Sequence, residues 1–148
     1  MKNRNVQKLE AITPGTLIVG VDIAKKTQWA RFVDYRGLEL RKALKFKNHK
    51  NGFDSILASI KEICKKRRLD NIIIGMEPTG HYWKPLTNYL LIHEVNVVMV
   101  NPYHTKRAKE LDDNSQTKND KKDALTIARL VRDAGIMKYI CPRIYLTN

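Results

Sequence analysis

Two short apolar segments, each followed at once by an acid, constrain the fold of this chain most strongly. Residues 16–22 read TLIVGVD and residues 71–77 read NIIIGME. Continuous β-branched runs of this length favour strands buried on both faces, as in a parallel pairing covered by helices. Because functional side chains gather at strand ends in such sheets, Asp22 and Glu77 are the first candidates for a site.

The segments that follow the first strand predict an antiparallel meander. Residues 28–34 and 38–46 both have strand-like content. Between them lies Asp34-Tyr-Arg-Gly37, a sequence typical of a tight turn. Together with residues 16–22 they predict three neighbouring strands that run in alternating directions.

The rest of the chain alternates helix and strand, and a strand, helix, strand order implies a parallel pair joined by a crossover. The expected architecture is therefore α/β, a mixed sheet of about five strands flanked by helices. In chain order we expect a helix from the cap Asn51 to the basic run 65–68, a strand at 71–77, a helix at 82–93, a strand at 95–100 and a helix at 119–134, with the polar residues 103–118 outside any element.

The charge of the chain points to a polyanionic partner. Of its 148 residues, 28 are Lys or Arg and 15 are Asp or Glu, which gives a net charge of +13. Such an excess of cations is typical of proteins that bind nucleic acid. The length suits one domain, and the polar residues 1–14 predict a flexible basic arm before a domain that begins near Gly15.

The composition also disfavours several classes of protein. No apolar run approaches the roughly 20 residues of a membrane-spanning helix, and the first residues lack the apolar stretch of a signal peptide. The two cysteines, Cys64 and Cys141, suggest neither a disulfide framework nor a metal-ligand cluster. A soluble, cytoplasmic protein without membrane partners is therefore expected.

Two further acids lie close together in the sequence Lys118-Asn-Asp120-Lys-Lys-Asp123. They are three residues apart at the start of the last expected helix, which puts both carboxylates on one face. If they meet Asp22 and Glu77, the four carboxylates repel one another unless a cation holds them. Mg²⁺ or Mn²⁺ is the natural choice, because hard divalent cations prefer oxygen donors and support phosphodiester chemistry.

Each acid also has a purely structural interpretation. Asp22 is placed to cap a turn, Glu77 stands in a loop before Pro78, and Asp123 has lysines beside it. The sequence from Thr117 to Asp120 matches the helix-capping pattern Ser/Thr-x-x-Asp/Glu, which accounts for Asp120 without any ligand. The metal-site hypothesis accounts for all four acids of this basic chain together.

Four short motifs stand in a fixed order along the chain. They are Gly20-Val-Asp22-Ile-Ala-Lys25, Met76-Glu77-Pro-Thr-Gly80-His-Tyr82, Val100-Asn-Pro102 and Thr117-Lys-Asn-Asp120-Lys-Lys-Asp123-Ala. In this order and spacing they resemble the N-terminal domain of the IS110-family transposases, which include the Piv-type DNA invertases. The resemblance covers most of the chain, from about residue 16 to residue 135.

The resemblance implies a RuvC-like, ribonuclease H-type fold and an enzyme that recombines DNA. It implies an Asp-Glu-Asp-Asp site for Mg²⁺ or Mn²⁺ whose catalytic residues are Asp22, Glu77, Asp120 and Asp123. Members of the family use a structured guide RNA to choose DNA sites, and the full-length protein is expected to be a homo-oligomer, a dimer or tetramer. The family's usual Asp-Arg-Lys-Asp is Asp120-Lys-Lys-Asp123 here, which keeps the charge but loses a forked donor.

The resemblance also implies a division of the chain. Residues 15–135 are expected to form the catalytic domain, and residues 136–148 to begin the connection to a C-terminal domain. In the family that second domain carries a serine thought to be the nucleophile of strand exchange. The serines Ser55, Ser59 and Ser115 stand in no matching motif, so none is assigned that role.

Basic residues around the acids are the expected contacts with the nucleic-acid backbone, because lysine and arginine are the usual phosphate ligands. Two rival functions stay open: a stand-alone metal-dependent nuclease or Holliday-junction resolvase, and a non-catalytic nucleic-acid-binding module whose acids are structural. The expected backbone contacts are Lys25, Lys106, Arg107, Lys118, Lys121 and Lys122.

Overall fold

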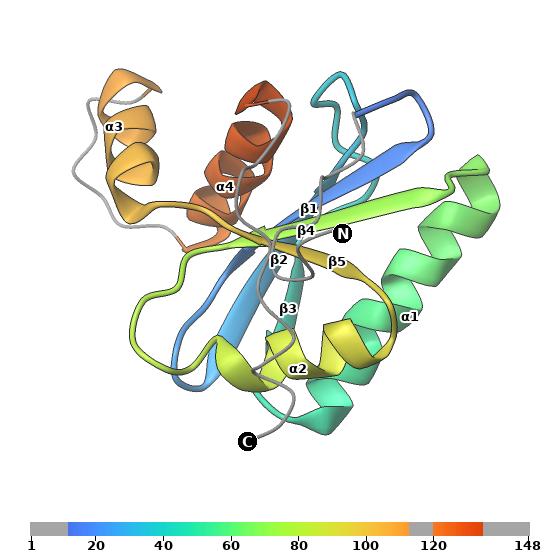
Figure 1. Ribbon diagram of the computed structural model, residues 1–148, viewed down its shortest axis with the longest axis horizontal. Coiled ribbons are helices and arrows are strands. Elements are labelled where there is room, and N and C mark those ends of the chain that lie inside the picture. The colour runs from blue at the N-terminus through green and yellow to red at the C-terminus, as the bar shows by residue number, and fades with distance from the viewer. Residues whose placement is uncertain (1–11, 113–119, 135–148) are drawn as a thin grey trace, which may run out of the picture.

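The computed structural model describes residues 12–112 and 120–134, and in this part of the chain no helix is long and apolar enough to cross a membrane. Within these described residues, five strands and four helices follow one another (Figure 1). The strands are β1 (Thr16–Asp22), β2 (Thr27–Val33), β3 (Leu44–Lys47), β4 (Asn71–Met76) and β5 (Asn96–Met99). The helices are α1 (Lys50–Arg67), α2 (Lys84–Ile92), α3 (Pro102–Asp112) and α4 (Asp120–Ala134).

The strands form one mixed sheet in the order β3-β2-β1-β4-β5. β1 pairs antiparallel with β2, and β2 with β3, while β1, β4 and β5 run parallel to one another. This arrangement confirms the predicted α/β architecture and its crossover between β4 and β5. It places β1 and β4 at the centre of the sheet, as their continuous apolar sequences indicate.

Two apolar layers cover the sheet, one on each face. Leu17, Val19 and Val21 of β1 point into the layer that α1 and α2 complete, whereas Ile18 points into the layer beneath α4. All four of these side chains are fully buried. Since alternate residues of a strand face opposite sides, burial on both faces explains why β1 carries no polar alternation.

Helix α4 packs directly on two glycines of the sheet. A Cβ atom on Gly20 of β1 would lie 2.1 Å from the carbonyl oxygen of Ala124 and 2.4 Å from the amide nitrogen of Ala128. A Cβ atom on Gly75 of β4 would lie 2.4 Å from Cγ2 of Val131. No side chain larger than hydrogen fits at either position, so the two glycines set the height of α4 above the sheet.

The expected turn at Asp34 to Gly37 is present, but the strand expected over residues 38–46 is shorter. The Asp34 carboxylate accepts hydrogen bonds from the amides of Arg36 and Leu38 at 2.9 and 3.0 Å. After a single bridge between Val33 and Glu39, the chain leaves the sheet and returns only at Leu44. The departure lets Arg41 donate to the Ser59 hydroxyl of α1 at 2.8 Å.

The first helix starts earlier than the cap at Asn51 predicts. His49 is the N-cap, and its Nδ1 accepts a hydrogen bond from the amide of Gly52 at 3.4 Å. As expected, the helix ends within the basic run, at Arg67, and Arg68 adopts a left-handed conformation after it. Lysine and arginine in the last turn are favourable because the helix dipole is negative there.

Helix α3 lies where the sequence predicts no element. Its first turn has a clear start signal, since the Asn101 side chain accepts a hydrogen bond from the amide of Tyr103 at 2.9 Å and Pro102 opens the helix. Its residues are mostly polar, so the apolar periodicity that identified the other helices is weak. The prediction for residues 103–112 was therefore wrong.

The segments expected at the two ends of the chain fall mainly outside the described residues, which leave out 1–11 and 135–148. Of the predicted arm, Ile12 packs against the apolar layer beneath α4. Thr13 accepts a hydrogen bond from Thr16 at 3.0 Å, which closes a turn before β1.

Gly20→Ala should destabilise the fold by about 2–3 kcal/mol, because the new methyl group overlaps the backbone of α4. The free energy of unfolding from urea titration measures this loss. Gly15→Ala is the matched control, since its Cβ would come closer than van der Waals contact only to the Asp70 carboxylate, an exposed side chain that can rotate away. Equal effects from the two substitutions would contradict the role of Gly20.

Candidate metal centre

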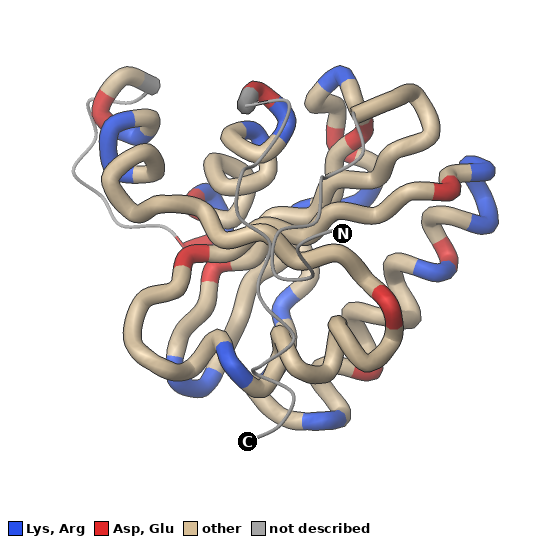
Figure 2. The backbone as a smooth tube through the Cα atoms, in the orientation of Figure 1, with Lys and Arg blue, Asp and Glu red and all other residues tan. Residues whose placement is uncertain are grey.

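The register of the two central strands brings the acids that follow them to the same edge of the sheet. Val21 of β1 pairs with Met76 of β4 in the parallel ladder. The next residues along the two strands are Asp22 and Glu77, which therefore lie at neighbouring strand ends. Figure 2 shows acidic residues gathered at these ends, beside the start of α4.

Helix α4 adds two more carboxylates to this edge. Asp120 and Asp123 lie in its first turn, and Asp123 is buried. Carboxylate oxygens of Asp22, Asp120 and Asp123 all lie within 4.8 Å of one another, and these three residues form the acid cluster. Glu77 is not a member of this group of three, although it is close enough to act on Asp22 electrostatically.

Burial and the neighbouring acids make ionisation of Asp22 unfavourable. Burial is the largest cause, followed by the negative charges of Asp120 and Asp123, and together with Glu77 they raise the pKa of Asp22 from 3.8 to about 7. A shift of this size marks a place where negative charge is concentrated away from water. A divalent cation would remove the repulsion, so the donor set fits a hard ion such as Mg²⁺ or Mn²⁺.

A lysine already offsets part of this charge. Nζ of Lys109 on α3 lies 3.3 Å from Oδ1 of Asp123 on α4. The sequence identified Asp123 as an acid with lysines beside it, but the partner is Lys109 of a different helix. This ion pair joins α3 to α4 at the acid cluster.

Two residues of β2 hold the first turn of α4 in place. Arg31 donates to the carbonyl oxygen of Lys121 at 2.9 Å, and its other partner is Glu39. The Lys121 ammonium lies 5.8 Å from the centre of the Trp29 ring, and Trp29 is the residue that pairs with Asp22. These contacts fix the backbone that carries Asp120 and Asp123 against the strand that carries Asp22.

Comparison with known proteins assigns this arrangement to a family. Residues 19–144 match the DEDD transposases of the IS110 type, whose family description is "Transposase". The chain belongs to this family. The recognition made from the four motifs is therefore confirmed.

The chain is also similar to two relatives and to one solved structure. The pilin gene-inverting proteins of Moraxella lacunata and Moraxella bovis are each 34% identical over 112 residues, which cover 75% of this chain. The chain spans about a third of their length, since the match covers 33% of each.

The solved structure is that of T. thermophilus RuvC in complex with Holliday junction substrate. It has a TM-score of 0.53 at 16% identity, covering 84% of this chain and 99% of that chain. The expected RuvC-like fold is confirmed.

The predicted phosphate contacts of this transposase-family chain lie on several elements around the acids. Lys25 is exposed in the loop after β1, and Lys106 and Arg107 are exposed on α3. Lys121 is exposed at the start of α4, whereas Lys118 lies outside the described residues. The sequence missed Lys45 of β3, whose ammonium lies 5.8 Å from the Trp29 ring centre, the same distance as Lys121. The available signal was strand alternation: because Phe46 is buried, the adjacent Lys45 has to point to the other face of the sheet.

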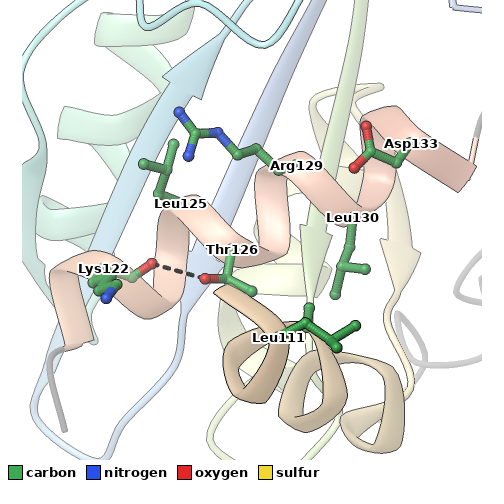
Figure 3. Close-up of a pocket in the computed structure, with 8 residues that line it drawn as sticks. Leu111, Lys122, Leu125, Thr126, Arg129, Leu130 and Asp133 are labelled. Atoms are coloured by element: carbon green, nitrogen blue, oxygen red, sulfur yellow. Dashed lines mark hydrogen bonds between the residues drawn. The ribbon is translucent and has the colours of Figure 1, made fainter. Parts of the chain in front are cut away.

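Lys122 has a different position. It lines a hollow of about 350 Å³ between α3 and α4, and its carbonyl oxygen accepts a hydrogen bond from the Thr126 hydroxyl at 3.2 Å (Figure 3). Leu111 and Arg129 also line this hollow. Lys122 thus lies on the side of α4 that faces α3, away from the sheet.

Asp22→Asn should stabilise the metal-free protein at pH 8 by about 1–2 kcal/mol, after allowance for solvent screening of this half-buried group. Folding raises the pKa of Asp22. The contribution of this residue to the free energy of unfolding should therefore be largest below pH 3.8 and should fall as the pH rises to about 7. Thermal unfolding in EDTA between pH 5 and pH 8 measures both effects. A variant as sensitive to pH as the wild type would contradict the assignment.

Proposed function

We propose that this chain is the metal-dependent catalytic domain of an IS110-type transposase that breaks and rejoins phosphodiester bonds of DNA. The observation that carries the proposal is the convergence of Asp22, Asp120 and Asp123 from two distant parts of the chain, with oxygens within 4.8 Å of one another. Membership of the transposase family and 34% identity to pilin gene-inverting proteins support it.

The carboxylates would hold the cation, and the elements that carry them would set its position. Asp22 is fixed by the pairing of β1 with β2 and β4, and Asp120 and Asp123 by the packing of α4 on Gly20. Glu77 follows the neighbouring strand and completes the four acids that the family resemblance implies. When bound, Mg²⁺ or Mn²⁺ supplies positive charge that stabilises the developing charge on phosphodiester oxygens.

Basic residues would bring the DNA backbone to these acids. Lys121 and Lys45 lie at the Trp29 ring next to the cluster, and Lys25 follows Asp22 in the loop to β2. Lys106 and Arg107 extend the basic surface along α3. Because polyanion binding releases counterions, these residues supply affinity without sequence preference.

The finer parts of the proposal rest on the family resemblance. They are a structured guide RNA that selects the DNA sites, a homo-oligomeric full-length protein and a strand-exchange nucleophile in a second domain. Acids that orient a phosphate supply no side-chain nucleophile for a covalent protein–DNA bond. We therefore assign phosphate positioning to residues 15–135 and strand exchange to these residues together with that second domain.

A Holliday-junction resolvase is the second candidate. It is favoured by the likeness to RuvC, because this chain covers 99% of a RuvC chain that was solved with Holliday junction substrate. The same four acids would serve in either case. The two candidates differ in the product, which is recombined DNA for the transposase and symmetrically cut junction arms for the resolvase.

Cleavage or recombination of DNA should require both a divalent cation and the acid cluster. We expect Asp22→Asn and Asp123→Asn each to lower the rate at least about 100-fold, because several kcal/mol of charge stabilisation are lost. The rate is measured on supercoiled plasmid and on a synthetic four-way junction, with Mg²⁺ and with EDTA. Recombination is measured with the chain extended through the second domain, cognate DNA and guide RNA.

Asp133→Asn is the matched control, since Asp133 lies on the same helix but outside the cluster. Full activity of the two cluster variants would overturn the proposal. Nucleic-acid binding without any cleavage in Mg²⁺ or Mn²⁺ would favour the rival in which the acids are structural.

DNA binding should weaken steeply as salt rises, and Lys121→Ala should reduce the slope of log K against log[salt] by about 0.9 if this residue contacts one phosphate. Lys61→Ala is the control, because Lys61 is exposed on α1, which covers the other face of the sheet. Fluorescence anisotropy at several salt concentrations gives both slopes. An unchanged slope for Lys121→Ala would remove this residue from the binding surface.

A further inference from the structure

A basic groove lies between α1 and the segment that joins β2 to β3. It has a volume of about 310 Å³. Ser59, Glu62, Ile63, Lys66 and Arg67 form one stripe of α1 along it, at the spacing of a single helix face. Leu40, Arg41 and Lys42 form the opposite wall. Four of these eight residues are cations and one is an acid.

Arg41 is held in position by the protein. Its Nη1 donates to the Ser59 hydroxyl at 2.8 Å, and its Nε donates to the carbonyl oxygen of Lys42 at 3.0 Å. The guanidinium carbon lies 5.4 Å from the centre of the Phe32 ring. A guanidinium fixed in this way is prepared to bind an anion, because little further rotamer freedom has to be lost.

The positive charge of the groove is not balanced by carboxylates. Within the described part of the chain, Arg41, Lys42, Lys66 and Arg67 form no ion pair, in contrast to Arg31, Arg36, Lys50, Lys109 and Arg132. Glu62 lines the groove but lies beyond ion-pair distance of these cations. Like charges gathered in a concave surface attract an anion of the opposite sign.

The groove is separate from the acid cluster. The C-terminal end of α1 precedes the start of β4, whereas the acids follow the other ends of β1 and β4. A seven-residue strand is about 20 Å long, so the two sites lie at opposite ends of the sheet. They also lie on opposite faces, since α1 and α4 complete different apolar layers. Figure 2 shows the cations at the end of α1 far from the acids that gather beside the start of α4.

We propose that this groove is a second binding site for the phosphodiester backbone of a nucleic acid, distinct from the strand that is cut. The proposal rests on the nucleic-acid function proposed above. Four unpaired cations suit a repeating anion better than a single small ligand. DNA flanking the cut site and a structured RNA share this backbone chemistry, and the experiment distinguishes them.

The test removes two groove cations and compares the result with a matched pair. Lys66→Ala/Arg67→Ala changes two exposed residues of the groove, and Lys61→Ala/Lys65→Ala changes two exposed residues of the same helix outside it. Each pair removes two positive charges. Circular dichroism and thermal unfolding verify that both variants fold. Binding to a DNA duplex and to an RNA hairpin is then measured by anisotropy in EDTA across a salt series.

The groove pair should reduce the slope of log K against log[salt] by about 1.4–1.8 and lower affinity about tenfold or more, with a clearly smaller effect from the control pair. A loss confined to RNA identifies the groove as an RNA site, and a loss confined to DNA identifies flanking DNA. Equal effects of the two pairs on both probes would overturn the groove proposal and leave the catalytic proposal standing. Failure of the wild type to bind either probe would overturn both.

Discussion

The close contact between α4 and the glycines of the two central strands is the constraint on which the rest of the structure depends. Gly20 leaves room for the backbone of α4 to rest on β1, and Gly75 leaves room for the Val131 side chain of α4 on β4. The buried residues Ile127, Ala128 and Val131 then close the apolar layer on that face. The same contact brings the first turn of the helix to the end of β1. One packing interaction therefore completes the core and assembles the acids.

The acid cluster works against the stability of the fold that carries it. Burial and three neighbouring carboxylates raise the pKa of Asp22 to about 7. Charge repulsion at this site therefore offsets part of the stability that the packing of α4 supplies. Lys109 reduces this cost by pairing with Asp123, and Arg31 holds the adjacent backbone. Sites that bind cations commonly accept such a cost, because ligand binding recovers it.

Much of the fold was predictable because its central strands are continuous apolar runs that only a covered parallel pairing can bury. The same runs placed Asp22 and Glu77 at one edge. Helix α3 was not predicted because it lacks an apolar stripe. It is defined instead by its cap and by its packing on α4. The pairing of Lys109 with Asp123 and the groove at Arg41 join segments distant in sequence, and no local pattern encodes such contacts.

The order of the elements along the chain has a consequence for synthesis on the ribosome. β1 is made early and α4 is the last element of the described part. Until α4 emerges, Ile18 and Ile73 lack the cover of this helix, and Glu77 is the one acid of the four already made beside Asp22. A nascent chain that ends before residue 120 therefore holds a nearly complete sheet but lacks Asp120 and Asp123, two of the three acids that come together in the folded chain. The order of translation therefore assembles the three acids only after every strand of the described sheet has been made.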